Sequence, residues 1–264
     1  MNYKIISFLV LIVITYACTP TSASSGREVL DMNTDWAFYR GEVKEGSRRE
    51  LDDSGWMAVA LPHIMQLETK HCGGNSIYDG IGWYRRYFKL PKKYKDKRIV
   101  VSFEGVMTNC TVYLNGQEIT KHHGGYMGFV SDLTDRIDWE GNNVLAVRVS
   151  AEYDPLTPPG KPQDKMDFYY YSGIYRDVRM EITDKIYVTD PLQEDLVAGG
   201  GQFVTFPEVT KEKAKTHVAT HIRNLTDQDA TLSVLSRLKD STGRVVSEIK
   251  TPVDLPGRSA WTVG

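Results

Sequence analysis

The chain has 264 residues, and its 32 basic residues nearly balance 34 acidic residues, which gives a formal net charge of −2. A hydrophobic fraction of 41% and a charged fraction of 25% are ordinary for globular proteins and exclude wholesale disorder. The near-zero charge argues against a nucleic-acid binder, because such proteins carry a basic excess. The length is enough for one or two domains, each with a hydrophobic core.

The first 17 residues have the pattern of an export signal. Lys4 supplies one positive charge, and a mostly apolar run follows it up to Ala17. The run is too short to span a bilayer comfortably, so we predict a secretory signal peptide over residues 1–17. Ala17 directly before Cys18 resembles a lipoprotein signal, in which Cys18 is lipidated and anchors the protein to a membrane. The alternative is an ordinary signal cleaved nearby. Both predict export, to the periplasm or the cell surface.

A flexible tether is expected after the signal, because residues 18–27 are rich in Ser and Thr. Cys72 and Cys110 are then the only ordinary cysteines. They could pair in an oxidising compartment, but one bridge makes no disulfide framework. We therefore favour buried free thiols over a bond.

Short strands separated by turn residues dominate residues 28–182. In chain order, the clearest candidates are residues 84–88, 99–103, 111–114 and 144–149. Asn115-Gly116, which follows the third of these, is the strongest short signal for a β-hairpin. The spacing predicts a sandwich or jelly roll. A proline-rich loop over residues 154–165 interrupts this domain late, and long loops of this kind are functional or disordered.

A second all-β domain is predicted over residues 183–264. Residues 217–222 and 231–235 alternate in the manner of strands. Their spacing resembles an immunoglobulin-like sandwich, which needs about 100 residues and seven strands. The remaining sequence is shorter than that, and residues 261–264 lie inside an expected strand. We therefore expect this second sandwich to be truncated.

Several segments form a family signature when they are taken together and in order. They are Trp56 with Val59-Ala60-Leu61-Pro62-His63, Gly82-Trp83-Tyr84-Arg85-Arg86-Tyr87-Phe88, Phe103-Glu104-Gly105-Val106, Val112-Tyr113-Leu114-Asn115-Gly116, His123-Gly124-Gly125-Tyr126 and Ser172-Gly173-Ile174-Tyr175-Arg176-Asp177-Val178. In this order and spacing they resemble the amino-terminal part of family 2 glycoside hydrolases, the group of β-galactosidases, β-glucuronidases and β-mannosidases. The resemblance covers residues 28–264.

The resemblance implies an all-β chain, with a jelly-roll (galactose-binding-like) sugar-binding domain over residues 28–182 and an incomplete immunoglobulin-like sandwich over residues 183–264. In this family two glutamates on a TIM barrel hydrolyse β-glycosides, and such a barrel needs about 250 further residues. We therefore expect the chain to be the non-catalytic front portion of an exported glycosidase resembling a β-galactosidase. It should lack the barrel and any catalytic residue, and be inactive by itself.

The resemblance also implies a substrate contact at Asp167. In the galactosidase branch, an acidic residue just before the Ser-Gly-Ile motif contacts the galactosyl unit and a sodium ion, and Asp167 is the matching residue. A carboxylate accepts hydrogen bonds from sugar hydroxyls and suits a hard cation, and the aromatic residues 168–171 offer faces for stacking. The alternative is a solvated loop acid. No cofactor is expected within this chain, and sodium or magnesium is implied only for the full enzyme.

A second family contact is an asparagine three residues before the glycine that precedes the Tyr-containing strand. Counting back from Gly82 gives Asp79. Aspartate accepts hydrogen bonds but cannot donate one as an amide does, which puts galactoside specificity in doubt. The alternative for Asp79 is a turn residue.

We interpret the histidines singled out by their sequence context as structural residues. We interpret His63 as a packed or capping residue rather than a catalytic one. His122 and His123 are adjacent in a predicted strand, so they point to opposite faces, and no Cys/His cluster accompanies them. A metal site is therefore not predicted at these residues.

A different functional class remains as an alternative: a self-standing carbohydrate-binding lipoprotein that captures glycans at the cell surface. A structural adhesive module is a third. The expected truncation argues against both, because a binding module should end at a complete domain boundary. In the first two interpretations the partner is a carbohydrate, with no nucleic acid and with membrane contact only through a lipid anchor.

Overall fold

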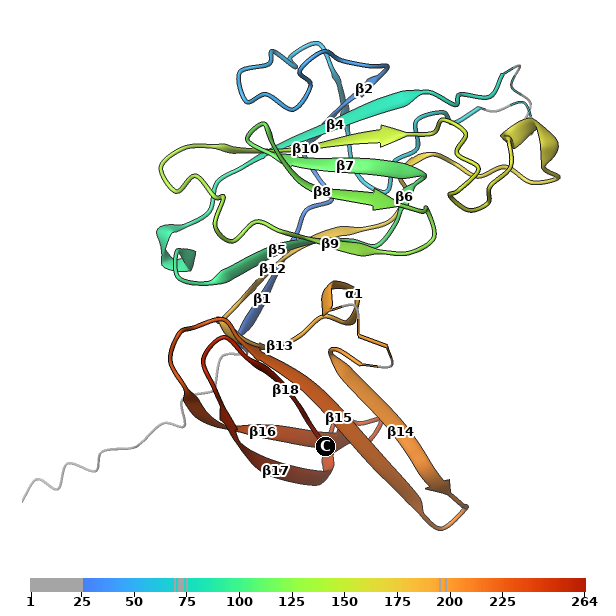
Figure 1. Cartoon of the computed structure of the whole chain (residues 1–264). Coiled ribbons are helices and arrows are strands. Elements are labelled where there is room, and N and C mark those ends of the chain that lie inside the picture. Colours follow the sequence, from blue (N-terminus) through green and yellow to red (C-terminus); the bar gives the residue numbers. More distant parts are fainter. Residues whose placement is uncertain (1–25, 69, 71–73, 75, 195, 198) are drawn as a thin grey trace, which may run out of the picture.

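The structure, a computed structural model, describes residues 26–68, 70, 74, 76–194, 196–197 and 199–264. The predicted signal peptide, most of the tether, Cys18 and Cys72 lie outside the described residues. The described chain folds into two successive β-sandwich units (Figure 1). No helix in this part of the chain is both long and apolar enough to span a membrane.

The first unit is a sandwich of two antiparallel sheets. Its larger sheet has the spatial order β3 (Met57–Val59), β2 (Trp36–Arg40), β4 (Ile81–Phe88), β10 (Asn143–Ser150), β7 (Asn109–Leu114) and β8 (Gln117–His123). Its smaller sheet has the order β1 (Arg27–Asp31), β12 (Val178–Thr183), β5 (Arg98–Phe103) and β9 (Phe129–Asp132). A short ribbon pairs β6 (Val106–Met107) with β11 (Gly173–Ile174). Neighbouring strands are often distant in sequence, as in a jelly roll, and the predicted fold class is confirmed.

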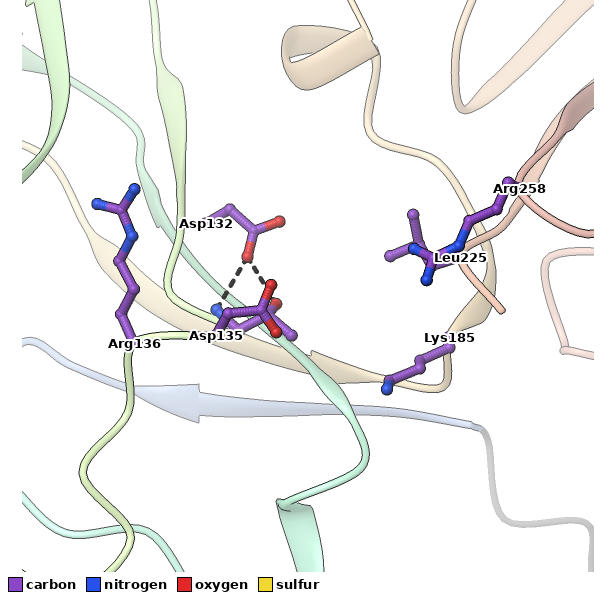
Figure 2. A pocket seen from close by; sticks show the side chains of 7 residues that line it. Asp132, Asp135, Arg136, Lys185, Leu225 and Arg258 are labelled. Carbon is purple, nitrogen blue, oxygen red and sulfur yellow. Dashed lines mark hydrogen bonds between the residues drawn. The ribbon is translucent and has the colours of Figure 1, made fainter. Parts of the chain in front are cut away.

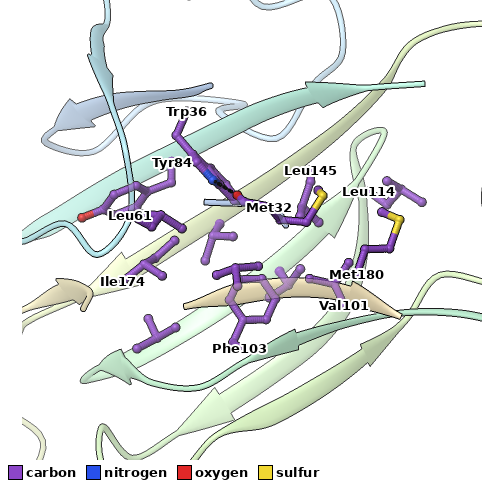
Figure 3. Close-up of a cluster of buried hydrophobic side chains, with 14 of the residues drawn as sticks. Met32, Trp36, Leu61, Tyr84, Val101, Phe103, Leu114, Leu145, Ile174 and Met180 are labelled. Carbon is purple, nitrogen blue, oxygen red and sulfur yellow. Dashed lines mark hydrogen bonds between the residues drawn. The ribbon is translucent and has the colours of Figure 1, made fainter. Parts of the chain in front are cut away.

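The core of this unit lies between the two sheets (Figure 3). Inward-facing side chains of β2 and β4 meet those of β5 and β12, as the two-residue period of a strand requires. Trp36 and Tyr84 are almost completely buried on one side, and Phe103 on the other. The indole N–H of Trp36 donates to the carbonyl of Met32 at 2.6 Å, so its one polar group is satisfied.

The predicted hairpin joins β7 to β8. Leu114 pairs directly with Gln117, so the turn has two central residues. Asn115 has a φ of 52° and Gly116 a φ of 86°, the left-handed pair that a type I′ turn needs. The side-chain amide of Asn115 also donates to Asn143 at 2.9 Å, which ties the turn to β10.

The outer face of the larger sheet is covered by the loop over residues 41–56. Arg85 of β4 points beneath this loop and is fully buried. Its guanidinium donates to the Asp53 carboxylate at 2.7 Å and to the carbonyls of Gly46 and Arg48 at 2.7 and 2.9 Å. Because a buried cation needs its charge and its donors satisfied, these bonds fix the loop against the sheet.

The second unit has a smaller core. One sheet contains β13 (Ile186–Val188), β15 (Ala214–Asn224), β14 (Gln202–Val209) and β18 (Ala260–Val263), and β16 (Ala230–Lys239) pairs with β17 (Val245–Leu255). The described residues thus hold six strands, against seven in an immunoglobulin constant-type sandwich. Its buried cluster is limited to Ile222, Val253, Leu255 and Val263.

A buried arginine lies where the two units meet. Arg98, which begins β5, is only 2% exposed. Its guanidinium carbon lies 4.2 Å from the centroid of the Tyr187 ring of β13, and one guanidinium nitrogen donates to the side chain of Gln193 in the short helix α1 (Pro191–Glu194). The second unit therefore supplies both partners of this cation.

Candidate functional site

Loops gather at the end of the larger sheet where β10 ends and β4 begins. The proline-rich loop after β10 returns there beside the segment that leads into β4 (Figure 1). Between them is a cavity of about 140 Å³. Its lining residues come from these two segments and are Ile77, Asp79, Ala151, Tyr153, Pro162, Gln163, Asp164 and Tyr170.

Asp79 lies in the segment that leads into β4. The hydroxyl of Tyr78 donates to the carbonyl of Ile81 at 2.6 Å, and the amide of Ala151 donates to the carbonyl of Gly80 at 2.9 Å. This segment is therefore fixed from both sides, while the Asp79 side chain is exposed and lines the cavity. Asp79 thus presents a carboxylate to the cavity.

Gln163 sets the shape of the opposite wall. It begins the 3-10 helix η3 (Gln163–Lys165) and is 7% exposed. Its side-chain amide donates to the carbonyl of Phe168 at 2.7 Å, and its side-chain oxygen accepts the amide of Tyr170 at 3.2 Å. This double contact closes the loop that carries Asp164 and Asp167.

The loop places its two aspartates differently. Asp164 lines the cavity together with Asp79, whereas Asp167 is exposed and is not among the lining residues. Asp167 does lie within the segment that Gln163 closes, next to Phe168, which is half exposed. The structure thus brings Asp79 and Asp164 together and leaves Asp167 at the outer side of the same loop.

Tyr170 supplies the polar aromatic group of the cavity. Burial raises the pKa of its phenol, and the nearby Tyr126 and Asp79 raise that pKa further. The phenol therefore stays protonated at neutral pH and can donate a hydrogen bond, while the aspartate carboxylates can only accept. Together with Tyr153, which is 49% exposed, the site offers ring faces, a donor and acceptors, the groups that a sugar ring needs.

Three of these groups were missed by sequence reasoning: Tyr153, Gln163 and Asp164. None belongs to the segments that resemble the family. The one available signal was the length of the proline-rich loop, since a long irregular loop in a compact domain is often functional.

The histidines have the structural roles expected of them. The Nδ1 atom of His63 lies 2.9 Å from the Tyr84 hydroxyl, and its ring packs 4.7 Å from that of Phe38. His122 stacks on Phe129 at 4.3 Å. The described residues contain no group of three or more His, Cys, Asp or Glu side chains able to hold a metal ion.

A second, larger cavity of about 410 Å³ lies between the two units (Figure 2). Asp132 and Asp135 lie on one side of it, and Lys185 and Arg258 on the other. Arg258 pairs with Asp227 at 2.7 Å, and the Asp132 carboxylate accepts two hydrogen bonds from Thr134. Among the described residues, no aromatic side chain lines this cavity, so it suits a sugar less well than the first one does.

Comparison with known proteins finds a sugar-binding domain in this part of the chain. The profile of the family described as "Glycosyl hydrolases family 2, sugar binding domain" matches residues 69–183, which include the cavity residues Asp79, Asp164 and Tyr170. This chain carries the sugar-binding domain of glycoside hydrolase family 2.

The chain has relatives along most of its length. It is 32% identical to a β-galactosidase of Bacteroides ovatus over 89% of this chain and 26% of that protein. It is 31% identical to a β-galactosidase of Thermoanaerobacter pseudethanolicus over 85% of this chain and 30% of that protein. Among solved structures, a Bacteroides uniformis β-glucuronidase superposes with a TM-score of 0.79 at 26% identity, over 90% of this chain and 27% of the other.

The chain spans less than a third of the length of these relatives. Its described residues form two β-sandwich units and include no TIM barrel. The cavity around Asp79 therefore belongs to a sugar-binding domain, without the barrel on which this family performs hydrolysis.

Proposed function

We propose that this chain is the amino-terminal, non-catalytic portion of an exported glycoside hydrolase resembling a β-galactosidase, and that its jelly roll forms part of the rim of the sugar site. The observation that carries the proposal is the cavity in which Asp79 and Asp164 meet Tyr153 and Tyr170, inside the segment matched by the family profile. The relatives named β-galactosidase and β-glucuronidase support a β-glycoside as the substrate class.

In this proposal the two carboxylates accept hydrogen bonds from sugar hydroxyls, and the protonated phenol of Tyr170 donates one. Tyr153 offers its exposed ring to the apolar face of a pyranose. Asp167, exposed on the same loop, contacts a part of the substrate that extends beyond the cavity. Bond cleavage itself is assigned to a barrel with an acid and a nucleophile, which these two sandwiches do not supply.

The proposal also includes where the protein is located in the cell. An export signal over residues 1–17 and lipidation of Cys18 would hold the enzyme at a membrane on the periplasmic or outer side. The tether after Cys18 would then separate the folded domains from the lipid surface. Mass spectrometry of the mature protein tests this step, because a diacylglyceryl group joined to the sulfur of residue 18 by a thioether bond adds a defined mass.

The central test measures hydrolysis of a panel of chromogenic β-glycosides by the full chain, alongside calorimetric titration with galactose and glucuronate. We expect no turnover, and weak sugar binding that Asp79→Asn or Tyr170→Phe reduces several-fold. Clear turnover would contradict the proposal, because it would require an acid and a nucleophile within the sandwiches. Tight binding by the chain alone would support the glycan-capturing lipoprotein instead.

A further inference from the structure

The charged side chains that line the cavity of the candidate site are all negative. Two of its eight lining residues are aspartates, Asp79 and Asp164. Among the described residues, none that lines this cavity is a lysine, an arginine or a histidine. A ligand that enters the cavity therefore meets two carboxylates that no cation of the lining balances.

The Asp79 carboxylate is available to a ligand. Its side chain is exposed, and within the part of the chain that the structure describes it forms no hydrogen bond or salt bridge. Burial raises the pKa of the Tyr170 phenol, and the charge of Asp79 raises that pKa further, so this charge is felt at the opposite wall. Asp79 and Tyr170 thus act on the same space from the two segments that form the cavity.

Asp164 is only weakly neutralised. Its salt-bridge partner is Lys165, whose ammonium nitrogen lies 3.8 Å from a carboxylate oxygen of Asp164. That separation is longer than a hydrogen bond, and both side chains are more than half exposed, so water screens the pair. Lys165 is not one of the lining residues. Asp164 therefore keeps a negative charge that a cationic group of a ligand can use.

The charges next to the Asp79 wall are negative on balance as well. Glu152 directly follows Ala151, which lines the cavity. Burial raises the pKa of the neighbouring Tyr78 phenol, the charge of Arg40 opposes this shift, and the charges of Asp79 and Glu152 add to it. Arg40 lies over the Tyr78 ring, 5.3 Å from its centroid, and outside the lining. Two carboxylates thus face one guanidinium on this side.

The size and the other groups of the cavity suit one edge of a pyranose ring. Its volume of about 140 Å³ is below the range of about 300–1,000 Å³ that small-molecule sites occupy, so it holds part of a sugar rather than a whole glycan. Tyr153 and Pro162 offer apolar surface, and the Tyr170 hydroxyl offers a donor. An ammonium group on the inserted edge would bring three donors and a positive charge to the two aspartates.

We propose that this cavity selects an amino sugar, a pyranoside that carries a protonated amino group. The ammonium group donates hydrogen bonds to Asp79 and Asp164, and the ring lies against Tyr153. A neutral sugar fits the same space without the charge, and a uronate brings a third carboxylate to the two already present. The inference rests on the proposed function and narrows its β-glycoside to a glycoside of an amino sugar.

The test titrates the full chain at pH 6 with three ligands that differ in charge: methyl β-glucosaminide, methyl β-glucoside and methyl β-glucuronide. At this pH the amine is protonated and the uronate is ionised, because an α-amino group titrates at about pH 8 and a carboxyl group at about pH 4. We expect the glucosaminide to bind about tenfold more tightly than the glucoside, since hydrogen bonds between charged groups are roughly twice as strong as neutral ones. The glucuronide should bind most weakly.

A double variant, Asp79→Asn with Asp164→Asn, keeps the shape of both side chains and removes their charges. It should bind the glucosaminide and the glucoside with equal affinity. Asp96→Asn is the matched control, because Asp96 is also exposed and follows the end of β4, whereas Asp79 precedes its start. The control also removes one negative charge from the chain, but it should keep the preference for the glucosaminide.

Equal affinity of the unaltered chain for glucosaminide and glucoside, tightest binding of the glucuronide, or a preference that survives in the double variant would overturn the inference. Tyr170→Phe separates it from the proposed function. If the unaltered chain binds glucosaminide and glucoside equally and Tyr170→Phe weakens both, the cavity binds sugars irrespective of charge, so the inference fails and the proposed function stands. Absence of binding for all three ligands would count against both.

Discussion

The Tyr84 hydroxyl lies next to both His63 and Gly173, which belong to segments far apart in the chain. It lies 2.9 Å from Nδ1 of His63, and a Cβ atom added to Gly173 would lie 2.7 Å from it and 2.6 Å from the His63 carbonyl. Gly173 also has a φ of 135°. The Leu-Pro-His segment, the tyrosine of β4 and the Ser-Gly-Ile segment are thus packed at one place, which explains in physical terms why all three occur together.

Replacing Gly173 by alanine should destabilise the first unit by at least about 3 kcal/mol, since the new methyl group meets backbone and buried side-chain atoms while φ is strained. Gly124→Ala is the matched control: its φ is 112°, but an added Cβ meets nothing within 4 Å. The control should cost only about 1 kcal/mol from backbone strain. Urea denaturation of both variants checks this, and equal losses would show that the contact at Gly173 is unimportant.

Stability should fall as the pH drops below about 6.5, the pKa of an unfolded histidine. Burial lowers the pKa of His63 and of His122, so below that pH the unfolded chain binds more protons than the folded one. Their contribution is therefore complete above pH 6.5 and is lost as the pH falls towards their folded pKa values. Urea midpoints at pH 7.5 and pH 5.5 measure the slope. His63→Gln should reduce it, and an unchanged slope in this variant would contradict the assignment.

Arg85→Met should destabilise the chain by about 3–5 kcal/mol, because it removes the positive partner of the Asp53 carboxylate and the donor of the Gly46 and Arg48 carbonyls beneath the loop. Arg237→Met is the control. Arg237 pairs with Glu248 at 2.6 Å, but both side chains are about half exposed, so the loss should stay below about 1 kcal/mol. A loss of similar size in the two variants would refute the role given to Arg85.

Cys110 should resist thiol reagents in the folded protein. It is buried in the core of the first unit, and burial raises the pKa of its thiol, so the reactive thiolate is scarce. Mass spectrometry after treatment with iodoacetamide should find residue 110 unmodified in buffer and modified in urea. Modification at equal rates in both conditions would contradict the buried position.

The strands of the first unit were predictable because their residues are β-branched or aromatic and are bounded by clear turns. Residues 99–103 lie within β5, residues 144–149 within β10, and the Asn115-Gly116 turn joins β7 to β8 as expected. Strand β2 was not predicted. Its buried residues Trp36 and Phe38 give only two alternations, and pairing with β4 supplies the rest of its stability.

The candidate site was predictable only in part. Asp79 was found by counting back from Gly82 according to the family resemblance, and Asp79 does line the cavity. The choice between Asp164 and Asp167 depends on how Gln163 closes its own loop through Phe168 and Tyr170, and no local pattern encodes such a contact. The burial of Arg85 was equally hidden, since its partners come from a loop about forty residues earlier.

The buried cation at the junction has a mechanical consequence. Arg98 loses its ring contact with Tyr187 and its bond to Gln193 if the two sandwiches tilt apart. Tilting is therefore opposed by the loss of these two contacts, and the two sandwiches should tumble in solution as one body with a single rotational correlation time. A sugar held near Asp79 would then keep a constant orientation relative to strand β15 of the second sandwich.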